Sequence, residues 1–67
     1  MYLKKLDPKT QKEYSKLKPF VSGTWYLKMN EDGTKARNAK GSPLLTCMAD
    51  EDLCLALAVG EFTRVEI

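Results

Sequence analysis

The residues of this chain with the clearest chemical potential are three adjacent carboxylates, Asp50, Glu51 and Asp52, and two thiols, Cys47 and Cys54. Neighbouring carboxylates can ligate Mg²⁺. At the start of a helix the same carboxylates are stabilised by the positive end of the helix dipole. We favour this structural role over a metal site. Neither thiol has a neighbouring cation in the sequence that would activate it as a nucleophile. A disulfide between them would depend on backbone placement, and buried free cysteine is the commoner outcome.

The sequence contains no histidine. This excludes Ser-His and Cys-His nucleophile pairs. With only two cysteines, a four-ligand zinc site lacks its ligands. Neither the P-loop pattern nor the glycine pattern of dinucleotide-binding folds is present. We therefore expect a protein that is not an enzyme, holds no metal and uses no cofactor.

Charge is unevenly distributed along the chain. Residues 1–41 carry ten Lys/Arg and four Asp/Glu, a net +6, and residues 42–67 carry one Arg and five Asp/Glu, a net −4, which sum to the overall +2. Such asymmetry can steer a charged partner, although the same charges also serve to solvate two surfaces. In the basic part, stacking surfaces and phosphate contacts for a nucleic acid are offered by Trp25, Tyr26, Lys28, Lys35, Arg37 and Lys40.

The length of 67 residues allows one domain, spanning 1–67. A chain this short buries only about 60% of its unfolded surface, so support from a partner or from self-association is expected. The start of the chain has no apolar h-region. The longest apolar run, 53–59, has seven residues, well short of the roughly 20 that span a bilayer. We expect a soluble protein, located in the cytoplasm, without membrane contact.

A short helix is predicted near 8–18. Asp7 followed by proline is a strong helix start, and Pro19 ends the helix because the residue before a proline is pushed out of helical geometry. Its apolar stripe consists of Tyr14 and Leu17. A stripe this narrow requires the helix to dock on the rest of the chain.

Alternating side chains predict strands near 24–29, 43–48 and 61–67. In the first of them, one face is formed by Trp25, Leu27 and Met29, and the other by Thr24, Tyr26 and Lys28. Between the first two strands, the segment 35–41 is basic and contains no large apolar residue. It is either a flexible arm or the weak return leg of a ribbon.

A second helix is predicted over 51–59, with Asp50 as its cap and Gly60 at its left-handed end. The side expected to cover the sheet consists of Leu53, Ala56, Leu57 and Val59. The opposite side consists of Cys54, Leu55 and Ala58. These apolar residues need a cover, which is either the N-terminal helix or a partner, and we favour the N-terminal helix.

The C-terminal third resembles the tail of the small RNA polymerase inhibitors made by lytic bacteriophages. The matching pieces are Asp52-Leu53, the Leu-Ala-Leu-Ala run at 55–58, and Thr63-Arg64-Val65. The resemblance implies a protein that occupies a surface on a host protein. In those inhibitors arginines on the last strand contact the polymerase. Arg64 matches one such position, and Glu66 stands where a second arginine is expected.

Together these patterns predict an α+β fold, with a small three-stranded antiparallel sheet in the order β-β-α-β over 23–67, one helix packed on it, and a helical segment over 1–22. We expect a non-catalytic binding protein, an inhibitor of the phage or mobile-element type that occludes a surface on a host complex such as RNA polymerase or a defence nuclease. The alternative is a nucleic-acid-binding module that uses the loop 35–40. A homodimer joined through Cys54, Leu55 and Ala58 is a third possibility. The expected partner-binding residues are Tyr26, Lys35, Arg37, Lys40, Phe62 and Arg64.

Overall fold

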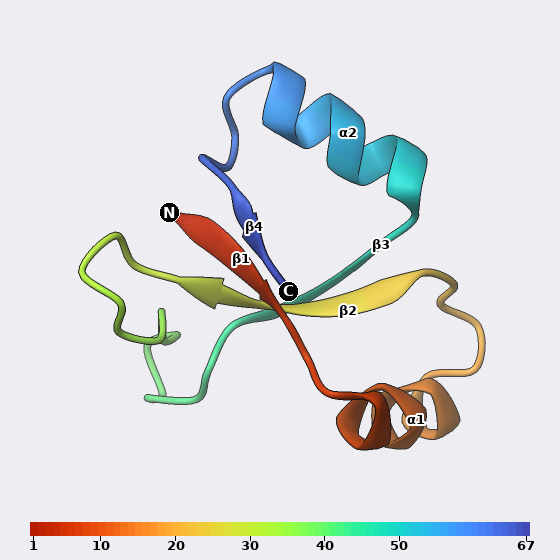
Figure 1. Cartoon of the computed structure of the whole chain (residues 1–67). Helices are drawn as coiled ribbons and strands as arrows, with labels where there is room; N and C mark the ends of the chain where they lie inside the picture. Colours follow the sequence, from red (N-terminus) through yellow and green to blue (C-terminus); the bar gives the residue numbers. More distant parts are fainter.

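The chain folds around a four-stranded mixed sheet flanked by two helices, an α+β architecture (Figure 1). The computed structural model describes residues 1–67. The strands lie in the order β3-β2-β1-β4. In chain order, the elements are β1 (Tyr2–Lys5), α1 (Pro8–Leu17), β2 (Thr24–Met29), β3 (Leu45–Met48), α2 (Asp50–Ala58) and β4 (Val65–Glu66). Neither helix has the length and apolar character needed to cross a membrane.

The predicted three-stranded antiparallel sheet is wrong, because β1 forms an additional strand in the middle of the sheet. It pairs antiparallel with β2 and parallel with β4. Its two apolar residues, Tyr2 and Leu3, point to opposite faces and are both buried, so neither helical nor alternating periodicity marks the segment. The last strand is also much shorter than predicted, because Phe62 turns into the core and the Thr63 amide donates to the Met1 carbonyl at 3.1 Å.

The sheet has apolar residues on both of its faces. The face beneath α2 holds a buried cluster of Leu3, Tyr26, Ala56 and Phe62, flanked by Met48, Leu53, Leu57 and Val65. The other face holds Tyr2, Leu27 and Met29, flanked by Leu6 and Leu45. The strand β2 is therefore buried on both sides, and Tyr26 is a core residue rather than an exposed partner contact.

The helix α2 is close to its predicted place, but it is one residue earlier at each end. Its N-cap is Ala49 rather than Asp50, and no side chain caps it. At its C-terminal end Gly60 adopts φ +81°, with the Glu61 amide donating to the Ala56 carbonyl at 2.9 Å and the Gly60 amide to the Leu57 carbonyl at 3.2 Å. This pair of bonds is a Schellman motif, so the predicted glycine end is confirmed.

The predicted contact side of α2 is correct at three of its four positions. Leu53, Ala56 and Leu57 pack on the core, whereas Val59 is 69% exposed. The N-terminal helix does not cover the opposite side of α2. Instead α1 contacts β2, where the rings of Tyr14 and Trp25 lie 5.3 Å apart, and Figure 1 shows the two helices well separated. The other apolar residue of its stripe, Leu17, is exposed.

The segment between β2 and β3 is an ordered arm with Ala36 at its base. The Ala36 amide donates to the Lys28 carbonyl, the Leu44 amide donates to the Ala36 carbonyl, and the Lys28 amide donates to the Leu44 carbonyl, each at 3.0 Å. These three bonds form a closed cycle around Ala36, which is buried. Backbone bonding thus orders a segment that lacks large apolar residues.

Replacing Ala36 by leucine should destabilise the fold by about 1–3 kcal/mol, because Ala36 is only 4% exposed and a larger side chain would have to displace its neighbours. The matched control is Ala39→Leu, at an exposed turn position, which should stay within about 0.5 kcal/mol of the parent. Urea unfolding measures both. Equal stability of the two variants would show that the base of the arm is loosely packed.

Candidate binding surfaces

Two of the predicted partner-binding residues belong to the core, and a third, Arg64, makes contacts within the fold although its side chain is 49% exposed. Tyr26 and Phe62 are 5% and 4% exposed and belong to the core beneath α2, so a partner cannot reach their rings. The guanidinium of Arg64 lies 3.8 Å from the centre of the Tyr2 ring, a cation–π distance. It also pairs with Glu31 at 3.4 Å and Glu66 at 3.7 Å.

The other three predicted residues lie on the arm and are not gathered into one site. Arg37 donates from Nη1 to the Gly41 carbonyl at 2.8 Å, which braces the turn at the tip of the arm. Lys40 is exposed in that same turn. Lys35 lies nearer the sheet and lines a groove that the arm shares with β1 and α1.

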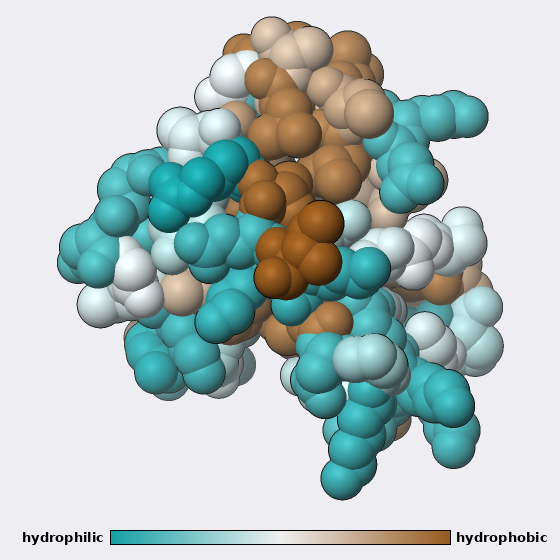
Figure 2. Space-filling model, viewed as in Figure 1, coloured by the Kyte–Doolittle hydropathy of each residue, from teal (hydrophilic) through white to brown (hydrophobic).

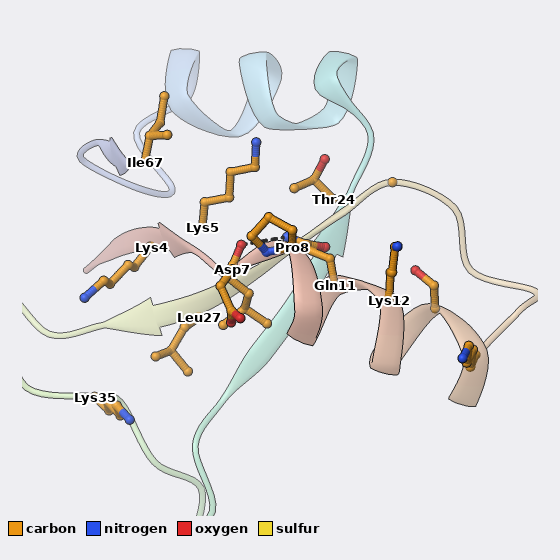
Figure 3. A pocket seen from close by; sticks show the side chains of 14 residues that line it. Lys4, Lys5, Asp7, Pro8, Gln11, Lys12, Thr24, Leu27, Lys35 and Ile67 are labelled. Atoms are coloured by element: carbon orange, nitrogen blue, oxygen red, sulfur yellow. Dashed lines mark hydrogen bonds between the residues drawn. The ribbon is translucent and has the colours of Figure 1, made fainter.

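This open groove has a volume of about 1200 Å³. Its lining residues lie around the connection between β1 and α1 (Figure 3). Its apolar lining comes from Leu6, Leu27 and Ile67. Its charged lining is formed by five lysines, Lys4, Lys5, Lys12, Lys16 and Lys35, which we call the lysine groove. The single acidic residue in the lining is Asp7, whose carboxylate accepts a hydrogen bond from the Thr10 hydroxyl that lowers its pKa.

Four of these five lysines were not among the residues predicted from the sequence. Two signals mark them: the adjacent pair Lys4-Lys5 and the i, i+4 pair Lys12 and Lys16, which share one face of a helix. Neither pair indicates that β1 and α1 line one groove. None of the five forms an ion pair, and they outnumber the one acidic side chain in the lining, Asp7.

The position of α1 against the sheet depends on Gln11. Its Nε2 donates to the Trp25 carbonyl at 2.7 Å, and its Oε1 accepts from the Trp25 amide at 2.8 Å. The side chain therefore continues the pairing of β2 beyond the end of β1, as one more residue of the strand would. This contact fixes the helix that carries Lys12 and Lys16.

The second surface is the outward side of α2. It consists of Cys54, Leu55, Ala58 and Val59, all exposed, which we call the α2 outer face. Leu55 is 63% exposed and Val59 69%, and Figure 2 shows apolar side chains gathered over this helix. Both cysteines are free thiols, and burial raises the pKa of the Cys47 thiol.

Glu31 links three distant parts of the chain at the surface. Its carboxylate accepts from the Met1 ammonium at 2.6 Å and from the Thr63 hydroxyl at 2.9 Å, and it pairs with Arg64. The hydrogen bonds from the ammonium and from Thr63, followed by the neighbouring positive charges, lower the pKa of Glu31. The arm is thereby tied to the start of β1 and to the segment before β4.

No protein-family model, curated protein or solved structure matches this chain. Its function must therefore be inferred from the two surfaces.

Replacing Gln11 by alanine should destabilise the fold by about 1–3 kcal/mol, because the Trp25 amide loses its partner even though alanine is the better helix former. Lys9→Ala, at an exposed position of the same helix, is the control and should change stability by less than about 0.5 kcal/mol. Hydrogen exchange should show faster exchange of the Trp25 amide in the Gln11 variant alone. Unchanged protection of that amide would contradict the proposed anchoring.

Replacing Glu31 by glutamine should lower the melting temperature near neutral pH and make little difference in acid. A carboxyl whose pKa is lowered by folding stabilises the fold above its unfolded value, here 4.5, and this contribution is lost as the pH falls through the folded pKa. The melting temperatures of the parent and the variant should therefore converge as the pH falls below 4.5 and through the folded pKa of Glu31. Glu13→Gln, at an exposed position without an ion pair, should show no such pH-dependent difference.

Proposed function

We propose that this chain is a non-catalytic binding protein that inhibits a host protein complex by occluding one of its surfaces, and that the contact is made by the α2 outer face. The observation that carries the proposal is the exposure of Leu55 and Val59 one helical turn apart. Of the two possible covers for this side of the helix, the N-terminal helix lies elsewhere, against β2. A partner protein is the cover that remains.

The helix is suited to present these residues rigidly. Leu53, Ala56 and Leu57 hold its inner side to the core, and the Schellman motif fixes its end. Apolar side chains on a preorganised element lose little conformational freedom on binding. An exposed apolar patch with a polar border is the common form of a protein contact site.

The border of the α2 outer face is acidic. Asp50, Glu51 and Asp52 lie in the first turn of the helix, and Glu61 follows its last turn. A partner with a basic rim would be drawn to this face. Complexes that handle nucleic acid, such as RNA polymerase or a defence nuclease, carry basic surfaces for phosphate, so they match this charge. The resemblance to phage inhibitors supports the same class of partner.

Replacing Leu55 by aspartate should abolish capture of the host complex, with affinity at least about 30-fold weaker if the residue is a central anchor. The matched control is Leu17→Asp, which introduces the same change at a leucine 72% exposed on α1 and should leave capture intact. Pull-downs from host lysate with purified wild type and both variants make the comparison. Equal capture by all three would exclude the α2 outer face as the contact.

Self-association through the same face is the competing explanation. It would appear as a melting temperature that rises with protein concentration in the wild type. The Leu55→Asp variant would then lose that dependence. A melting temperature independent of concentration leaves the face free for another protein.

A further inference from the structure

We infer that the lysine groove binds the phosphodiester backbone of a nucleic acid, without reading its sequence, as a second site independent of the α2 outer face. The groove brings together five cations from three separate segments, namely β1, α1 and the arm. Of the loop 35–40, which the sequence suggested for nucleic-acid binding, only Lys35 lines the groove. The site is thus a product of the tertiary fold.

The charges of the groove are available to a ligand. None of the five lysines is paired with an acid, and all five side chains are exposed. The acidic residues of the C-terminal part lie mainly around α2, away from α1 (Figure 1). Several unpaired cations around one hollow concentrate the positive potential there and attract a polyanion.

The geometry fits a chain of phosphates that passes over the start of α1. In Figure 3 the side chains of Lys4 and Lys5, which are neighbours on β1, point to opposite sides of the strand, Lys5 toward α2 and Lys4 away from it. Lys35 lies on the side of Lys4, and Lys12 lies on α1 beyond the connection between the two elements. Cations spread along a groove, rather than converging on one point, match the spaced charges of a polymer better than a single small anion.

The composition of the lining favours phosphate over an acidic polypeptide. Protein contacts depend mainly on aromatic and arginine anchors, and the groove contains neither. Lysine is an effective point charge for phosphate. The absence of an aromatic ring also leaves no platform for stacking a base, so the contacts are to the backbone and carry no sequence information.

The test is fluorescence-anisotropy titration of the full chain with labelled random-sequence oligonucleotides of about 20 nucleotides, single-stranded and duplex, across a range of salt concentrations. With up to five contacts, log K should fall with log salt at a slope of about −3.5 for the single strand, which is roughly a 100-fold loss between about 50 and 200 mM. The triple variant K5Q/K12Q/K16Q should reduce that slope by about 2 and weaken binding about 100-fold at 0.1 M salt.

The matched control is K9Q/K18Q/K40Q, which removes the same charge from exposed lysines outside the groove. It should retain the parent slope, and the Leu55→Asp variant should bind the oligonucleotide as the wild type does. Circular dichroism and melting temperature establish that each variant is folded. Equal losses in the two triple variants would show general charge attraction and overturn the site. The proposed site would also be overturned if the wild type bound neither oligonucleotide, or if it bound polyglutamate more tightly than either oligonucleotide.

Discussion

Most of this fold depends on the burial and pairing of β1. Its backbone joins β2 on one side and β4 on the other, so it connects the β2–β3 pair to the C-terminus. Leu3 is completely buried beneath α2, and Tyr2 is buried on the opposite face under the Arg64 guanidinium. A strand of four residues therefore contributes one buried side chain to each core. In a chain of 67 residues, which can bury only a modest apolar area, the loss of this strand would open both faces of the sheet.

This arrangement also separates the two surfaces from which we infer function. The chain leaves β1 directly into α1, which Gln11 fastens to the edge of β2, and the lysines of both elements then border one groove. The α2 helix packs over the other side of the sheet, with its acidic first turn and its apolar outer face exposed. The charge asymmetry of the sequence thus becomes a spatial asymmetry, in which one surface is lined by lysines and the other is apolar with an acidic border.

The candidate sites were predictable only in part. Exposed cations on the arm follow from their sequence, because nothing nearby could bury them. Tyr26, Phe62 and Arg64 were proposed as contacts, yet the first two are core residues, and Arg64 is held by Tyr2 and Glu31. An aromatic residue on a strand has the same sequence signature whether its face is open or covered. The groove escaped prediction because its lysines are distributed over residues 4–35, and only folding brings them together.

The sequence alone determined those features that depend on local chemistry: the proline-started α1, the strand β2, the acidic first turn of α2 and its glycine end. These follow from backbone preferences and hydrogen bonds within a few residues. Tertiary structure decided the strand β1, the parallel pairing of β4, the order of the arm and the exposure of the α2 outer face. Each of these depends on partners distant in the chain, since a four-residue strand or an alanine becomes buried only when other segments close around it.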